Sequence, residues 1–177
     1  MNIIARTMGH FRMIKKHRLL VCNLCFKCGL YYQGLTHDLS KYSPIEFLNG
    51  VRFYTGTCSP HAGERKKYGY SRAWNHHKTL NKHHVEYWRD IAQNSTMPNR
   101  YFVEMVCDRL AACMIYNKGS YDDLEAILYR ISLKHIKQLH PESRKLVEYW
   151  ITVIHKYGAE ASFDYIKHFL KNDNSLK

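Results

Sequence analysis

The sequence lacks a hydrophobic run long enough to cross a membrane. Its most apolar stretch, residues 19–30, is interrupted by Asn23 and Lys27, whereas a transmembrane helix needs ~20 mostly apolar residues. The N-terminus also lacks the apolar segment of a secretory signal peptide. We therefore expect no membrane partner and a cytoplasmic location.

Acidic residues are scarce. The chain has 15 Asp and Glu against 27 Lys and Arg, which gives a formal net charge of +12. The basic residues are spread along the whole chain, a distribution that fits either a solvated basic surface or a preference for polyanions. Nucleic acid therefore stays a candidate partner beside a small anionic substrate.

No long stretch alternates apolar and polar residues in the way that a β-strand requires, and the chain has no internal repeat. Apolar residues instead recur at three- and four-residue spacing, as Val103, Val106 and Leu110 do. With 45% hydrophobic residues in 177 positions, the chain can bury a core. We predict an all-α fold, with residues 1–177 forming one compact bundle of about seven helices.

Start and stop signals place these helices. Ser43, Pro44 and Glu46 form a capping box at one helix start, and Pro141 opens another. The expected helices cover residues 9–32, 44–54, 71–88, 100–117, 120–134, 141–158 and 159–171, with irregular structure over 55–70.

The six cysteines do not form a secreted disulfide framework. The run Cys22-x-x-Cys25-x-x-Cys28 copies part of an iron–sulfur ligand spacing, but Tyr32 stands where a fourth thiolate would be expected. We interpret these cysteines as small apolar residues of a helix.

Histidine, in contrast, is abundant, and two stretches concentrate it. In the first, His37 and Asp38 are adjacent and Lys41 follows three residues later. An adjacent His and Asp can give one cation a nitrogen and an oxygen ligand, and a lysine beside them can reach an anion held on that cation.

The second stretch, residues 71–88, carries His76, His77, His83 and His84. On one continuous helix His77 and His84 would share a face, while His76 and His83 would form a separate pair. Imidazole is the commonest protein ligand for transition metals. We therefore expect metal binding by at least one pair, and the sequence leaves open which pair faces the site.

Two further residues are candidates because of the faces on which they lie. His17 falls on the apolar stripe of its helix with Val21 and Leu24, and is predicted to point into the core. Asp108 shares a face with Ala111 and Ala112, where a carboxylate needs either a cation or an ion pair with arginine.

Taken in order, these residues read H…HD…H…HH…D, which resembles the HD-domain superfamily of metal-dependent phosphohydrolases. The segments HDLSKYSPIEF, WNHHKTLNKHHVEYW and EMVCDRLAA resemble more closely a smaller family of bacterial and phage proteins that we place in or near that superfamily. Ser40 in place of a common glycine, Val85 after the His pair and the short gap between His17 and His37 depart from the usual pattern. The short gap leaves His10 as an alternative to His17.

The resemblance implies a set of metal ligands. The first metal would be held by His17, His37, Asp38 and Asp108, and a second, bridged by Asp38, by His77, His83 and His84. Lys41 would contact the substrate phosphate, so that Asp38 and Lys41 carry the catalytic roles. One or two divalent ions are implied, and Mn, Fe, Co, Ni and Zn are not distinguished.

The resulting expectation is a metal-dependent phosphohydrolase acting on a nucleotide or another small phosphate ester. Two alternatives stay open at this point. The chain could be a di-iron oxygenase on the same fold, because related His and Asp cages hold iron pairs. It could also be a basic nucleic-acid-binding protein in which the His and Asp cluster holds a structural metal.

Overall fold

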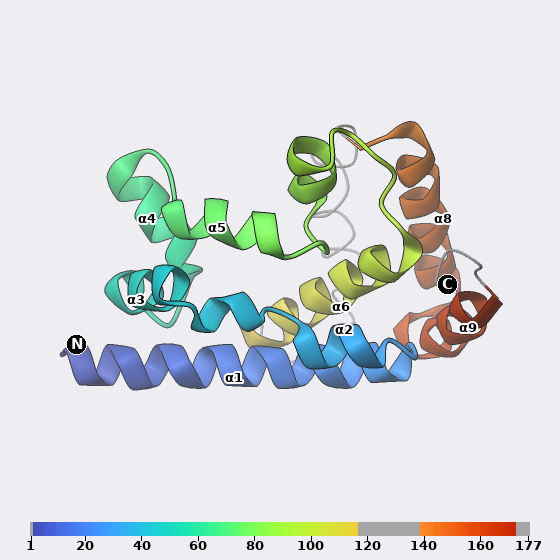
Figure 1. Ribbon diagram of the computed structural model, residues 1–177. Helices are drawn as coiled ribbons and strands as arrows, with labels where there is room; N and C mark the ends of the chain where they lie inside the picture. The colour runs from blue at the N-terminus through green and yellow to red at the C-terminus, as the bar shows by residue number, and fades with distance from the viewer. Residues whose placement is uncertain (1, 117–138, 173–177) are drawn as a thin grey trace.

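The computed structural model of the chain describes residues 2–116 and 139–172, and all regular structure in these ranges is helical (Figure 1). The α-helices are α1 (Ile3–Lys27), α2 (Tyr31–Thr36), α3 (Pro44–Phe53), α4 (Pro60–Tyr68), α5 (Arg72–Leu80), α6 (Asn99–Tyr116), α8 (Pro141–Tyr157) and α9 (Ala159–Asn172). A 3₁₀ turn, η1 (Leu39–Tyr42), precedes α3, and a π-helical turn, η2 (Tyr87–Ile91), follows α5. The predicted all-α fold is confirmed; the helix expected over 120–134 lies outside the described residues.

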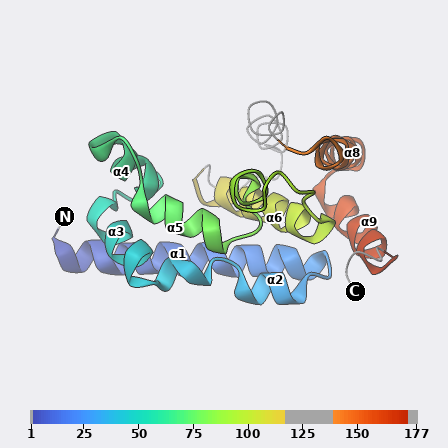
Figure 2. The ribbon, with the colours of Figure 1, turned by 45° about the horizontal axis from the view of Figure 1, so that its top comes forward.

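The longest helix, α1, forms one side of the molecule, and α6 and α2 pack along it (Figures 1 and 2). Its first turn is capped by Asn2, whose side chain accepts a hydrogen bond from the Ala5 amide at 2.8 Å. One stripe of α1 is buried, including Ile14, Val21 and Leu24. The sequence predicted this stripe, and the same stripe carries His17.

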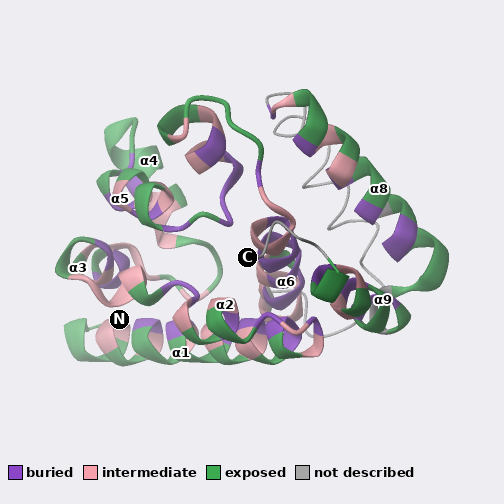
Figure 3. Cartoon of the chain, turned by 45° about the vertical axis from the view of Figure 1, so that its right-hand side comes forward, coloured by how far each residue is buried: buried purple, intermediate pink, exposed green. Residues whose placement is uncertain are grey.

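A contiguous core joins the two ends of the chain. It includes Val21 of α1, Phe102 and Leu110 of α6, Trp150 of α8 and Ile166 of α9. Buried residues follow the sides of these helices that face one another, while the outer sides are exposed (Figure 3). The core thus holds α1 and α6 rigidly together, so that residues on these two helices keep a fixed relative position.

The thiols of α1 and α6 take part in this core. Cys25, Cys28 and Cys107 are free and buried, in keeping with their interpretation as small apolar residues. Hydrogen bonding to Cys25 and Cys28, together with burial, raises the pKa of the Cys107 thiol well above its usual value, so the thiol stays neutral.

Three predicted boundaries are wrong. The first helix begins at Ile3 and ends at Lys27, because Gly29, with a φ of 77°, turns the chain back into α2. The segment 55–70, expected to be irregular, contains α4. The helix expected over 71–88 ends at Leu80.

Asn81 explains where α5 ends. Its backbone is extended, and its side-chain amide donates to the His77 carbonyl at 2.8 Å, beside the Asn81 backbone amide, which donates to the same oxygen at 3.1 Å. The following loop is held by Trp88, whose indole nitrogen donates to the Lys82 carbonyl at 2.6 Å. His83 and His84 therefore lie on a loop that is fixed at both ends.

None of the helices in residues 2–116 and 139–172 combines the length and the apolar character needed to cross a bilayer.

We expect Leu110→Ala to lower the free energy of unfolding by about 2–5 kcal/mol, because it opens a cavity between α6 and its neighbours. The control is Leu19→Ala on the outer side of α1, where the side chain is 60% exposed and the change should stay within about 0.5 kcal/mol. Denaturant unfolding followed by circular dichroism measures both. Equal effects would contradict the assignment of the core.

Candidate metal centre

His37 and Asp38 lie at the junction between α2 and η1. Asp38 adopts a left-handed backbone with a φ of 53°, a conformation that Asp tolerates better than most residues. Arg18 of α1 holds the junction in place, because its guanidinium donates to the carbonyls of His37 at 2.7 Å and Leu35 at 2.9 Å. The turn directs both the imidazole and the carboxylate inward, where each is 1% exposed.

The Asp38 carboxylate lies between two groups of imidazoles. Its Oδ2 is 3.3 Å from His37 Nε2 and 3.9 Å from His17 Nε2. Its Oδ1 is 3.3 Å from His77 Nε2 and 3.5 Å from His83 Nε2. Each carboxylate oxygen thus faces its own set of nitrogens, which is the geometry of a bridging ligand.

The first group brings together the four residues His17, His37, Asp38 and Asp108. Each offers one ligand atom, and these atoms lie within 4.8 Å of one another. They come from α1, the α2–η1 junction and α6, with His17 Nε2 at 2.9 Å from Asp108 Oδ1.

The second group consists of Asp38, His77, His83 and His84, again with ligand atoms within 4.8 Å of one another. The expectation that His77 and His84 would oppose a pair of His76 and His83 is wrong. It assumed one continuous helix, whereas the chain leaves α5 after Leu80 and brings His83 to the site. His76 turns away and hydrogen-bonds Glu46 instead.

Several polar atoms at the centre have no hydrogen-bond partner although they are buried, among them His37 Nε2, His83 Nε2, His84 Nε2 and Asp38 Oδ1. An unsatisfied buried polar group costs about 1–3 kcal/mol. Imidazole nitrogens and carboxylate oxygens that converge in this way match the donors preferred by first-row transition metals. The residues therefore fit one or two divalent cations.

Two glutamates orient these imidazoles from behind. Glu104 of α6 accepts a hydrogen bond from His37 Nδ1 at 2.9 Å and lies 3.1 Å from His83 Nδ1. Glu46 of α3 accepts from His77 Nδ1 at 2.7 Å. Each contact fixes the tautomer that leaves Nε2 free to bind a metal, as carboxylates behind metal-bound histidines do.

Sequence reasoning missed both roles. It assigned Glu46 to helix capping, which the structure retains only in the hydrogen bond from the Glu46 amide to Ser43 Oγ. It gave Glu104 no role. The available signal was a glutamate on the buried side of an apolar helix, where it needs a partner.

The centre combines charged carboxylates with imidazoles whose pKa values shift in opposite directions. Burial opposes the charged form of Asp38, yet His37 and Lys41 outweigh it and hold the pKa of the carboxyl well below its usual range. Burial together with neighbouring imidazoles lowers the pKa of His84, so its ring is neutral with a free lone pair. Asp108 has a lowered pKa because the hydrogen bond from His17 and the nearby His37 ring outweigh burial. Charged carboxylates and a neutral imidazole are the forms that bind metals. For His37, burial is outweighed by Asp38 and Glu104, which raise the pKa of its ring well above the usual value, so a metal bound there would displace a proton.

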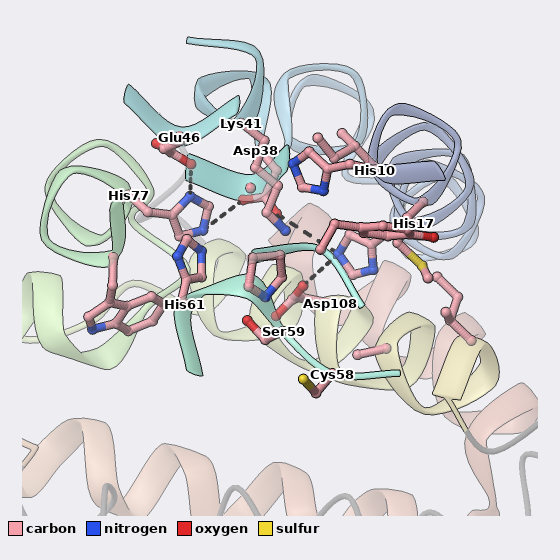
Figure 4. Close-up of a pocket in the computed structure, with 18 of the residues that line it drawn as sticks. His10, His17, Asp38, Lys41, Glu46, Cys58, Ser59, His61, His77 and Asp108 are labelled. Atoms are coloured by element: carbon pink, nitrogen blue, oxygen red, sulfur yellow. Dashed lines mark hydrogen bonds and ion pairs between the residues drawn. The ribbon is translucent and has the colours of Figure 1, made fainter. Parts of the chain in front are cut away.

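A cavity of ≈ 190 Å³ opens beside the centre (Figure 4). Lys41 lies in it with its ammonium nitrogen 2.7 Å from Asp38 Oδ2. His10, His61 and Trp74 line the same cavity, as do Asp38 and His77. His61 reaches the cavity from α4, a helix that the sequence pattern did not predict.

His10 belongs to the cavity and not to either ligand group of the described residues. Its ring sits against Gly50 of α3, where a Cβ atom would lie only 1.9 Å from His10 Nε2. Of the two histidines that the sequence left as alternatives for the first ligand group, the structure places His17 in the group, with its ring beside Asp108.

Residues 6–153 match the family of unknown function DUF5662. The chain belongs to this family. The matched range contains every residue of both ligand groups and both orienting glutamates. No curated protein and no solved structure matches the chain. The chemistry of the site is therefore the basis for assigning a role to this DUF5662 protein.

We expect the metal-free DUF5662 protein to bind two Mn²⁺ or Zn²⁺ ions per chain in titration calorimetry. Asp38→Ala should lose at least one ion and weaken the other, because both groups share this carboxylate. His76→Ala, which removes an imidazole outside both groups, should leave the stoichiometry unchanged. Full binding by Asp38→Ala would contradict the assigned centre.

Glu104→Gln should weaken metal binding about 10–100-fold. The glutamine side chain is uncharged, so it holds the Nδ1-protonated forms of His37 and His83 less firmly than the carboxylate does. The matched control is Glu148→Gln on the exposed side of α8, which should bind metal as the wild type does. Competition with a chromophoric chelator measures both affinities. An unchanged affinity for Glu104→Gln would remove this residue from the site.

Proposed function

We propose that this DUF5662 protein is a metal-dependent phosphohydrolase that acts on a nucleotide or another small phosphate ester. One observation carries the proposal: the Asp38 carboxylate lies between two histidine groups, with the Lys41 ammonium at 2.7 Å, at the edge of a cavity. A bridging carboxylate, neutral imidazoles and a lysine are together suited to hold cations and an anionic group beside them.

The ligands would be His17, His37, Asp38 and Asp108 for one cation, and Asp38, His77, His83 and His84 for a second. Mn, Fe, Co, Ni and Zn all accept such nitrogen and oxygen donors. When bound, a pair of divalent cations supplies Lewis-acid stabilisation of phosphoryl oxygens and makes water a stronger nucleophile at neutral pH.

The protein's own groups would bind and orient the substrate. Lys41 can offset negative charge that develops on the phosphoryl group. Burial and the positive charge of Lys41 lower the pKa of His10 to about 4, and burial and His77 lower that of His61 to about 3. Both rings are therefore neutral near pH 7 and can donate hydrogen bonds without adding charge.

The size and lining of the cavity favour a small substrate group. Its volume of ≈ 190 Å³ lies below the roughly 300–1,000 Å³ of sites for drug-sized ligands. Trp74 offers an aromatic face for a base or another flat group, and His61 packs against it with ring centroids 5.8 Å apart. The free state of all six cysteines fits action in the reducing cytoplasm.

The metal-loaded protein should hydrolyse at least one member of a panel of phosphate esters that contains nucleotides and sugar phosphates. Lys41→Met should keep its metal but lose about 10²-fold in kcat/KM, because one charge on the phosphoryl group is no longer offset. Lys15→Met on the exposed side of α1 is the control and should be fully active. Absence of hydrolysis together with oxygen uptake by an iron-loaded protein would replace the proposal with a di-iron oxygenase.

A further inference from the structure

Residues 2–85 expose no carboxylate. Residues 2–85 contain fourteen Lys and Arg but only three acidic residues, Asp38, Glu46 and Glu64. All three are buried. The surface contributed by these residues is therefore positive wherever it is charged, although acidic residues do occur at the surface elsewhere, as Glu148 does.

The three carboxylates are also engaged inside the protein. Asp38 and Glu46 belong to the metal centre and its orienting contacts. Glu64 of α4 accepts hydrogen bonds from the Ser71 hydroxyl and from Asn49 Nδ2, the latter at 2.9 Å. None of them offsets the charge of the surface lysines and arginines, so this surface attracts polyanions.

Cations and aromatic rings are concentrated over α4 and the adjoining ends of α3 and α5. We call this surface the α4 patch; it consists of Arg52, Arg65, Lys66, Lys67, Tyr68, Tyr70 and Arg72. All seven residues are exposed. Figures 1 and 2 show α4 at the edge of the molecule, beside α3 and α5.

Within the α4 patch, charges and rings alternate in space. The Arg52 guanidinium lies 5.7 Å from the centroid of the Tyr68 ring, and Lys67 Nζ lies 5.2 Å from the same ring. Tyr70 is 61% exposed, which leaves its ring accessible for stacking. Cations that follow a phosphodiester backbone, with aromatic faces between them for the bases, are the elements of single-strand binding surfaces.

A hollow gives the α4 patch a site for an anion. It has a volume of ≈ 340 Å³, and Arg52 of α3 and Arg72 of α5 both line it. The one acidic residue in its lining is Glu64, which is buried and hydrogen-bonded. Two guanidiniums on one hollow suit a phosphate group, because their planar donors match its oxygens.

The α4 patch also reaches the metal centre. The Arg65 guanidinium lies 5.7 Å from the ring centroid of Trp74, and Trp74 lines the cavity beside Asp38. The ring of His77, a candidate ligand, has its centroid 5.8 Å from that of Trp74. A nucleic-acid strand lying on the α4 patch would thus have one end next to the cavity.

We propose that the α4 patch binds single-stranded nucleic acid, with phosphates on its five cations and bases on Tyr68 and Tyr70, and that the end of the strand enters the cavity. Only the last part rests on the proposed hydrolase function. A single strand fits better than a duplex because stacking on tyrosine requires unpaired base faces. The exposed aliphatic side chains Ile45 and Leu48 line the hollow beside the α4 patch, so binding to a lipid surface is the competing outcome that the test separates.

The test is fluorescence anisotropy with a labelled 12-nucleotide oligothymidylate, an oligouridylate and a duplex of the same length. Wild type should prefer the single strands, and log Kd should depend on log salt with a slope of about 3.5 for five neutralised phosphates. The triple variant Arg65→Gln, Lys66→Gln, Lys67→Gln should bind at least ten-fold more weakly, with a slope lower by about 2.

A charge-matched control is available on α1. Arg12→Gln, Lys15→Gln and Lys16→Gln together remove the same three charges from an exposed surface of a different helix (Figure 1), and should change affinity less than three-fold. Tyr68→Ala with Tyr70→Ala should weaken binding about ten-fold without changing the salt slope, because stacking and not charge is lost.

Equal losses in the two triple variants would overturn the proposal, as would tighter binding of the duplex or a preference for anionic phospholipid vesicles. Every preparation is also assayed for hydrolysis of the phosphate-ester panel, so that binding and hydrolysis are measured on the same protein. Binding that persists while no phosphate ester is hydrolysed would refute the hydrolase alone. Hydrolysis of small esters without oligonucleotide binding would refute only the proposal that the α4 patch binds nucleic acid.

Discussion

The structure depends on one buried carboxylate. Asp38 is 1% exposed, and its two oxygens face imidazoles that come from four different parts of the chain. A carboxylate in such surroundings is costly unless positive charge compensates it. Lys41 supplies one charge from the same turn, and the unsatisfied Nε2 atoms around it indicate the position of others.

The ends of helices, more than their interiors, build this centre. His37 and Asp38 follow the last turn of α2, and His83 and His84 follow the end of α5. Such junctions allow side chains to converge from directions that one continuous helix cannot offer, but they need to be held. Arg18 holds the first through two backbone carbonyls. Asn81 holds the second, because its amide also donates to Ser40 of η1 at 2.8 Å.

The sequence predicts the fold better than it predicts the shape of the site. Periodic apolar residues predicted α6, and Pro141 and Gly158 bounded α8, because burial and backbone restriction act locally. The helix α4 was missed because PHAGERKKY has no apolar stripe, and its fold comes from tertiary contacts such as those of Glu64. The type and order of residues predicted which side chains the structure brings together: all seven candidate ligands lie in two groups that could hold a metal ion. The predicted pairing of His77 with His84 and of His76 with His83 was wrong because α5 ends early. It ends just before Asn81, whose side chain is held by a hydrogen bond to Ser40, a contact that is distant in sequence.

Carboxylates and basic residues are separated in the first part of the chain: the carboxylates are buried, and the lysines and arginines lie mostly at the surface. Residues 2–85 use all three of their carboxylates inside the protein, so the exposed charge of this segment is positive. In a chain with a net charge of +12, one of these carboxylates, that of Asp38, is thus gathered with imidazoles in groups that could hold a metal ion, while the exterior of the segment favours anions.

The most direct test of the central claim is a crystal structure of the Mn²⁺-loaded protein with anomalous data at a wavelength where manganese scatters strongly. The account predicts two anomalous peaks about 3.5–4 Å apart, one on each side of the Asp38 carboxylate. The absence of any peak at Asp38, or manganese bound only elsewhere on the protein, would contradict it.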